Sequence, residues 1–189
     1  MKLATAAYPM DFLDSFDAYA AKLTAWVADG AANGAELLVF PEYGAMELAT
    51  LRGRAVAGDL EASLHAVSEA IPAADALHSE LAQKYGVHIL GASGPVFDTE
   101  IGSRPVNRAR LFTPTGAMGV QDKQIMTRFE REDWNVVPGG PLRLFDTSLG
   151  RIAVLICYDS EYPLLGRALR EADLVLVPSC TEALAGYWR

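Results

Sequence analysis

The chain has 189 residues, 51% of them hydrophobic and 21% charged, a composition that supports a buried core and argues against a disordered chain. It has 16 basic and 24 acidic residues, and the formal net charge of −8 is not offset by any lysine- or arginine-rich block. This acidity argues against nucleic acid and against an anionic membrane surface as partners.

In the first half of the chain, strands alternate with helices. The helical pattern of residues 59–85 contains Pro72, which we expect to split it into two helices because proline lacks the N–H and clashes with the preceding turn. Residues 91–105 are rich in Gly, Ser, Asp and Pro and are expected to be the loosest part of the chain. The other predicted elements are a strand at 2–7, a helix from a cap at Asp14 to about Ala32, and buried strands at 37–40 and 87–90.

The second half is expected to contain two strand pairs and a final helix and strand. A turn with proline and glycine at residues 113–116 is typical of a hairpin. Because strands and helices alternate at both ends around central hairpins, we predict an α/β layered domain with a mixed sheet, in one unit over residues 1–189. The predicted strands are 108–112, 117–123, 142–145, 151–156 and a buried 174–177, with a helix at 163–171.

Features of export or cofactor binding are absent from the sequence. The apolar stretch at the N-terminus ends at Pro9 and Asp11, too early for a signal peptide, and no apolar run approaches the length of a membrane span. We expect the two cysteines, Cys157 and Cys180, to be reduced. Metal-ligand spacings and G-x-G-x-x-G or Walker loops are also missing, so we predict a cytoplasmic protein with no metal or other cofactor.

Three side chains that could take part in catalysis each lie where an apolar strand ends. Cys157 ends the run 152–156 and precedes a predicted helix, so a sharp turn there would present its thiol beside backbone N–H groups that lower its pKa. Glu42 follows the run 37–41, and Lys123 ends the strand 117–123. Taken singly, each has an ordinary interpretation: a core cysteine, a surface glutamate and a solvated edge lysine.

Together the three residues suggest nucleophilic catalysis. A thiol nucleophile needs a base that accepts its proton and a cation that holds the oxyanion. The histidines His65, His78 and His88 have no local setting that pairs them with a cysteine, so a carboxylate is the more natural base.

These motifs resemble those of the nitrilase superfamily of carbon–nitrogen hydrolases. The matching segments are LVFPE, which ends in Glu42, DKQIM, which contains Lys123, and ICYDSEYP, which contains Cys157. The resemblance implies an α-β-β-α sandwich that assembles into homodimers or larger oligomers. It also implies that Cys157 is the nucleophile, Lys123 the oxyanion stabiliser and Glu42 the general base and acid.

Further site residues follow from the same resemblance. A second glutamate is expected downstream of the lysine, and Glu130 is the match, although Glu132 and Asp133 lie close enough to confuse the alignment. The backbone N–H of Tyr158 is expected to help hold the oxyanion. The side chains Arg128, Trp134, Tyr43 and Tyr158 are the candidates for substrate binding, with Tyr162 as a further pocket neighbour and ordinary packing as the alternative for the loop residues.

The expected substrate is a small amide, with carbamoyl amides and nitriles as less favoured choices. In the family, residues 185–189 would open a long helix followed by further strands, so the C-terminal portion of the sandwich is expected to be missing. Two alternatives stay open. One is a flavodoxin-like redox sensor or deglycase with a Glu/Cys pair, and the other is a non-catalytic interaction protein on a nitrilase fold.

Overall fold

The computed structural model describes residues 1–181. The expectation for residues 185–189 lies outside the described residues. The strands, in chain order, are β1 Leu3–Thr5, β2 Leu37–Val39, β3 His88–Val96, β4 Val106–Phe112, β5 Met118–Asp122, β6 Leu144–Thr147, β7 Gly150–Val154 and β8 Leu174–Leu176. The helices are α1 Phe16–Ala32, α2 Arg54–Ala57, α3 Leu60–Tyr85, α4 Arg128–Glu132 and α5 Pro163–Ala168, with 3-10 helices η1 Gly44–Arg52 and η2 Cys157–Glu161.

The strands form two mixed sheets. The larger sheet has the order β1-β2-β3-β4-β5, in which β1, β2 and β3 are parallel and the pairs β3–β4 and β4–β5 are antiparallel. The smaller sheet has the order β6-β7-β8, with an antiparallel first pair and a parallel second pair. As a result β2, β3 and β5 run in the same direction, and their carboxyl ends lie at one edge of the larger sheet.

Alternation along the strands creates two apolar layers. Leu38, Ile89 and Phe112 face α1 and α3, whereas their neighbours Leu37, Leu90 and Leu111 face the second sheet. The second sheet presents a complementary apolar surface to them through Ile152, Val154, Ile156 and Leu176. A third, smaller cluster packs α5 on the outer side of β6 and β7.

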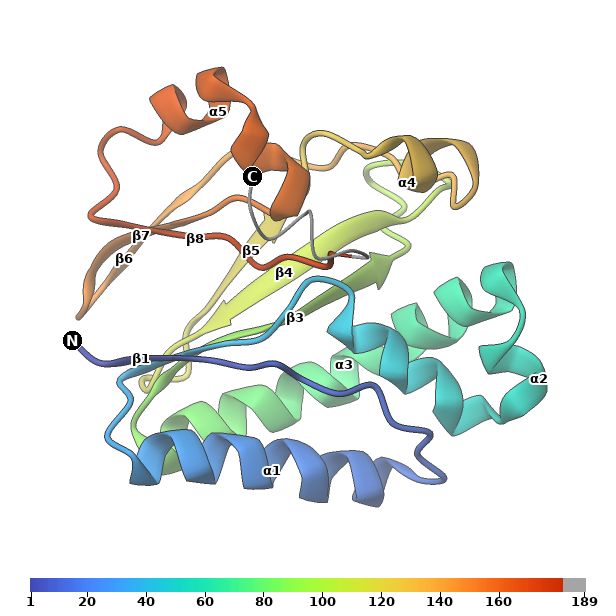
Figure 1. The fold of residues 1–189 in the computed structure, drawn as a ribbon, viewed down its shortest axis with the longest axis horizontal. Coiled ribbons are helices and arrows are strands. Elements are labelled where there is room, and N and C mark those ends of the chain that lie inside the picture. Colours follow the sequence, from blue (N-terminus) through green and yellow to red (C-terminus); the bar gives the residue numbers. More distant parts are fainter. Residues whose placement is uncertain (182–189) are drawn as a thin grey trace.

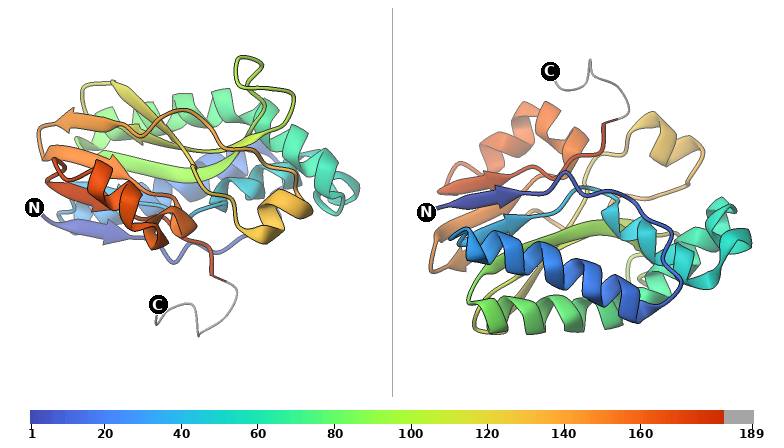
Figure 2. Two further views of the ribbon diagram at one scale, coloured as in Figure 1. Left: turned by 90° about the horizontal axis from the view of Figure 1, so that it is seen from above. Right: turned by 60° about the horizontal axis from the view of Figure 1, so that its bottom comes forward.

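Figure 1 shows the resulting order of layers, with α1 and α3 on one side of the two sheets and α5 on the other. The views in Figure 2 show the same stacking from two further directions. This α-β-β-α arrangement confirms the predicted sandwich. It does not fit the flavodoxin-like alternative, whose single open sheet is mostly parallel.

Several sequence predictions need correction. Helix α3 continues through Pro72, which lies on its exposed side, because Ile71 and Ala74 on either side of the proline pack in the same core cluster. Strand β3 extends to Val96, well into the stretch expected to be loose. The cap of α1 is Ser15 rather than Asp14, since the Ser15 side chain accepts the bond from the Ala18 N–H.

Strand β8 also differs from the prediction of a wholly buried strand. Val175 and Val177 are 40% and 41% exposed, so one face of this edge strand is open in the part of the chain described here. No helix among residues 1–181 combines the length and the apolar character needed to cross a membrane.

Candidate active site

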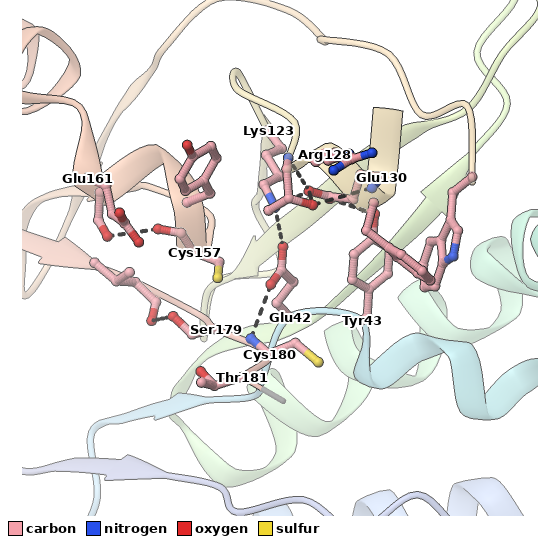
Figure 3. A pocket seen from close by; sticks show the side chains of 16 residues that line it. Glu42, Tyr43, Lys123, Arg128, Glu130, Cys157, Glu161, Ser179, Cys180 and Thr181 are labelled. Atoms are coloured by element: carbon pink, nitrogen blue, oxygen red, sulfur yellow. Dashed lines mark hydrogen bonds and ion pairs between the residues drawn. The ribbon is translucent and has the colours of Figure 1, made fainter. Parts of the chain in front are cut away.

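The three strand-end residues singled out in the sequence meet at one pocket (Figure 3). Glu42 follows β2 and Lys123 follows β5, two strands that run in the same direction in the larger sheet. Cys157 follows β7 of the second sheet, so the pocket opens where the two sheets end together. Helix α4 adds Glu130.

Lys123 is the centre of the charged part of the site. Its side chain is 1% exposed, and its Nζ lies 2.7 Å from Glu42 Oε1 and 2.6 Å from Glu130 Oε2. A buried ammonium is costly unless it is paired, and here two carboxylates flank it. Burial alone would lower the pKa of Lys123, but the two carboxylates outweigh burial and raise it, so the lysine is held as a cation.

Glu130 is fixed by the start of helix α4 and not by a loop. Thr127 caps the helix, and the Glu130 carboxylate reaches back to the Thr127 N–H and Oγ1, each at 2.9 Å. The hydroxyl of Tyr43 donates to the other oxygen, Oε1, at 2.7 Å. Burial raises the pKa of Glu130, but Lys123 and these donors outweigh it and leave the pKa below its usual range.

Asn107, on β4, donates hydrogen bonds to both carboxylates. It is fully buried, and its Nδ2 donates to Glu42 Oε1 at 3.1 Å and to Glu130 Oε1 at 3.3 Å. This residue was not among the predicted site residues. Its only signal is a polar side chain in an otherwise buried strand, which a single sequence does not distinguish from an ordinary packing residue.

The thiol is presented by a strained elbow. Cys157 has φ of 49°, a left-handed conformation that costs a non-glycine residue about 1–2 kcal/mol. Its N–H donates to the carbonyl of Pro178 at 2.9 Å, which ties the elbow to the end of β8. The turn that follows is the 3-10 helix η2, and the predicted helix begins only at Pro163.

Asp159 connects this elbow to the lysine segment. Its fully buried carboxylate accepts the backbone N–H groups of Gln124, Ile125 and Ile156, at 2.8 to 3.2 Å. Asp159 lies within the cysteine motif but was not among the predicted site residues. Three backbone donors from two segments show that it sets the position of Cys157 relative to Lys123.

The thiol and the base have raised pKa values. Burial raises the pKa of Cys157 from its ordinary value of 9.0 to about 11, and the nearby Glu42 carboxylate adds to the effect. The expected lowering of this pKa by backbone donors is therefore wrong, since burial outweighs the N–H of Cys180. Burial likewise raises the pKa of Glu42, although Lys123 opposes the shift. The thiol is thus protonated at neutral pH and sits beside a carboxylate whose affinity for protons is enhanced.

The pocket is lined by all four residues predicted for catalysis and by all four substrate-binding candidates, but not by the further predicted neighbour Tyr162. Tyr43 and Phe129 each pack edge-on against Trp134, which gives the pocket an aromatic wall. Tyr162 does not line the pocket but packs edge-on against Tyr158. The lining consists of Glu42, Tyr43, Lys123, Thr127, Arg128, Phe129, Glu130, Trp134, Cys157, Tyr158, Ser160, Glu161, Val177, Ser179, Cys180 and Thr181.

Two of the lining residues, Arg128 and Cys180, have contacts of different kinds. Arg128 has a side chain that is 84% exposed and pairs with Glu132 at 2.7 Å, so its charge is already matched. Cys180 donates its backbone N–H to Glu42 Oε2 at 3.1 Å.

Within the described residues, no group of three or more His, Cys, Asp or Glu side chains is placed to hold a metal ion.

The chain is similar in sequence to carbon-nitrogen hydrolases. The family model for carbon-nitrogen hydrolases matches residues 2–188. The probable hydrolase YhcX of Bacillus subtilis is 32% identical over 192 residues, an alignment that covers 100% of this chain and 36% of YhcX.

Solved structures share the fold. A carbon-nitrogen hydrolase from Helicobacter pylori superposes with a TM-score of 0.74 at 21% identity, over 96% of this chain and 60% of that one. A variant of the amidase from Nesterenkonia sp. AN1 is described as showing Michael addition of acrylamide at the active-site cysteine. It superposes with a TM-score of 0.68 at 25% identity, over 95% of this chain and 66% of the amidase. The chain thus spans about a third of YhcX and 60–66% of the two solved proteins.

Proposed function

The chain belongs to the carbon–nitrogen hydrolase family, and we propose that it cleaves the carbon–nitrogen bond of a small amide through a thioester on Cys157. The observation that carries the proposal is the meeting of Cys157, Lys123 and Glu42 at one pocket, with the lysine and the glutamate 2.7 Å apart and buried. The similarity to the Nesterenkonia amidase favours an amide over a carbamoyl amide or a nitrile.

The first half of the reaction forms the thioester. As Cys157 Sγ attacks the amide carbon, its proton passes to Glu42 and the carbonyl electron pair moves onto oxygen. Lys123 and the backbone N–H of Tyr158 stabilise that negative charge. When the carbon–nitrogen bond breaks, Glu42 returns its proton to the leaving nitrogen, so ammonia or an amine departs.

The second half hydrolyses the thioester. Glu42 takes a proton from water, and the resulting hydroxide attacks the acyl carbon. The carbon–sulfur bond then breaks, the carboxylic acid leaves, and the sulfur recovers the proton from Glu42. Glu130 does not exchange protons in this scheme, since its lowered pKa keeps it ionised, and its role is to hold Lys123 and Tyr43 in place.

The raised pKa values support this assignment of roles. A thiol with a pKa of about 11 is almost entirely protonated at neutral pH, so the reaction needs a base at the moment of attack and not a preformed thiolate. Burial raises the pKa of Glu42, which improves it as a proton acceptor.

The test is a search for an acyl adduct on Cys157. The 189-residue chain is incubated with a panel of primary amides, quenched in acid, and analysed by intact mass and peptide mapping. We expect an added acyl mass on Cys157 that disappears in Cys157→Ala and persists in Cys180→Ser, which separates the two pocket cysteines. An adduct confined to Cys180 would contradict the assignment.

A non-catalytic role on the same fold makes the opposite prediction. Such a protein would form neither an acyl adduct nor a carboxylic acid product with any amide, carbamoyl amide or nitrile in the panel. The set of Glu42, Lys123 and Cys157 is intact, and Glu42 and Glu130 both pair with Lys123. This arrangement favours the catalytic alternative.

Self-association and a cytoplasmic location remain predictions. Three exposed apolar side chains, Leu164, Val175 and Val177, lie on and beside α5 and β8 and are consistent with a contact between copies. Light scattering during size-exclusion chromatography measures the mass directly, and a monomer at micromolar concentration would contradict the expected dimer.

A further inference from the structure

Asn107 contacts both carboxylates of the site, although neither the sequence motifs nor the proposed mechanism uses it. Its Nδ2 lies 3.1 Å from Glu42 Oε1 and 3.3 Å from Glu130 Oε1. Only the NH2 end of an amide can donate to two carboxylates, so these contacts fix the orientation of the side chain. Among the described residues, the other end, Oδ1, is buried without a hydrogen-bond partner.

The two oxygens of Glu42 have different surroundings. Oε1 accepts from both Lys123, at 2.7 Å, and Asn107, at 3.1 Å. Oε2 accepts the backbone N–H of Cys180, at 3.1 Å, and the Glu42 carboxylate also interacts with the Cys157 thiol. That same N–H also interacts with the Cys157 thiol, which places Oε2 on the side of the nucleophile. Figure 3 shows the lysine contact and the Cys180 contact on opposite oxygens of Glu42.

We propose that Asn107 is a positioning residue that, together with Lys123, saturates Oε1 of Glu42 and so makes Oε2 the atom that exchanges protons with Cys157 and with water. The proposal rests on the proposed amide hydrolysis. A carboxylate with one oxygen held by two donors cannot rotate without losing both bonds. The remaining oxygen therefore keeps a fixed direction toward the thiol throughout the reaction.

The same contacts affect how readily Glu42 ionises. Donors to a carboxylate favour its charged form, so removal of Asn107 should make Glu42 easier to protonate. The charged and titratable groups that face Glu42 are Lys123 after β5, Glu130 from α4, Cys157 after β7 and the neighbouring Tyr43. All four remain in an Asn107 variant.

The experiment measures the rate of Cys157 acylation against pH for three variants, by quenched intact mass with an amide that acylates the unmodified chain. Asn107→Leu keeps the volume and removes the donor, and Asn107→Asp keeps the shape and adds a third carboxylate. Gln121→Leu, on the neighbouring strand β5, is the control because it also removes a buried amide, whose hydrogen bonds among the described residues go to Asp122, Pro141 and Arg143 and not to Glu42.

For Asn107→Leu we expect the maximal rate to fall about 10- to 100-fold, as for loss of a hydrogen bond to a charged group. We also expect the acidic limb of the profile to move up by roughly one pH unit. Asn107→Asp should move that limb further in the same direction, because the added carboxylate repels the charged form of Glu42. Gln121→Leu should lower the melting temperature and leave the acidic limb in place.

The outcomes separate this inference from the proposed function. If Asn107→Asp, which preserves shape, acylates with the rate and acidic limb of the unmodified chain, Asn107 only fills space and the inference is wrong. If Asn107→Leu fails to fold by circular dichroism, the result for Asn107→Asp decides alone. If the unmodified chain never acylates at Cys157, the proposed function fails and this inference fails with it.

Discussion

Among the described residues, two clusters each pair a lysine with a buried glutamate and a tyrosine, and of these two the second lines the active-site pocket. In the first, Glu47 is fully buried and bonds the Tyr8 hydroxyl at 2.8 Å, the Asp11 N–H at 2.7 Å and the Lys22 ammonium. We call these four residues the anchoring cluster, because they fasten the segment around residues 8–11 to the 3-10 helix η1. None of them lines the pocket.

The second, which we call the site cluster, consists of Glu42, Lys123, Glu130, Asn107 and Tyr43. It also pairs a buried lysine with two carboxylates and a tyrosine, as Lys22 pairs with Glu47 and Asp11, but here both carboxylates are buried, whereas the Asp11 side chain is 54% exposed. One of those carboxylates faces a thiol across a pocket. The pairing in the anchoring cluster holds a segment in place, whereas under the proposed mechanism a buried carboxylate beside a nucleophile acts as its base. Matched substitutions in the two clusters test this.

The glutamates should give the largest difference. Glu42→Gln removes the base and should reduce amide turnover about 10²- to 10⁴-fold. Glu47→Gln should leave the turnover of the folded fraction unchanged and lower stability, because the Lys22 ammonium loses its buried partner. Turnover and urea unfolding are measured on the same preparations. Equal losses of turnover in the two variants would remove the distinction between the clusters.

The same substitution has an opposite effect on simple alkylation of the thiol. The Glu42 carboxylate helps to hold the pKa of Cys157 at about 11, so replacing it with a neutral amide should lower that pKa. At pH 9, iodoacetamide should therefore modify Cys157 faster in Glu42→Gln than in the unmodified chain, while amide turnover is lost. Peptide mapping at several times gives the rate. Slower alkylation at pH 9 would mean that Glu42 does not face the thiol as a charge.

The lysines form the second pair. Lys123→Met leaves two buried carboxylates without a cation and should cost about 3–5 kcal/mol of unfolding free energy. Loss of the oxyanion donor should also slow turnover about 10²- to 10³-fold. Lys22→Met should lower stability but leave the turnover of the folded fraction intact. If Lys22→Met slows turnover as much, the anchoring cluster is coupled to the site.

Some residues of the candidate site could be predicted from the sequence and others could not. Glu42, Lys123 and Cys157 could be found because each follows an apolar strand, and parallel strands bring their ends to one edge. Asn107 and Asp159 could not, because their roles depend on partners 23 to 65 and 3 to 35 residues away. Helix α4 was missed although Thr127 and Glu130 have the T-x-x-E spacing of a capping box.

Two of the errors in secondary structure, at residues 91–96 and at Pro72, have one common cause, which is packing that overrides local preference. The glycines of residues 91–94 favoured a loop, but a side chain at Gly94 would lie 2.8 Å from Ala45, so this glycine permits close packing within a strand. Pro72 favoured a helix break, but both halves of α3 bury apolar residues against the same sheet. Local sequence patterns do not contain these distant neighbours.

The tyrosines form the third pair and should give the smallest effects. Tyr43→Phe removes the 2.7 Å bond to Glu130 but keeps the ring against Trp134. Glu130 retains its bonds from Lys123, Asn107 and Thr127, so turnover should fall only about tenfold or less.

Tyr8→Phe is the matched change in the anchoring cluster, since it removes the 2.8 Å bond to Glu47. It should lower the unfolding free energy by about 1.5–3 kcal/mol with no change in the kcat of the folded protein. Steady-state kinetics and urea unfolding on both variants decide the matter. Because the two substitutions delete the same hydroxyl from the same kind of bond, a difference in kcat between them reports the position of Tyr43 and its partner Glu130 at the pocket. Equal kcat values would show that Glu130 anchors its helix, as Glu47 anchors its segment, and does not support the reaction.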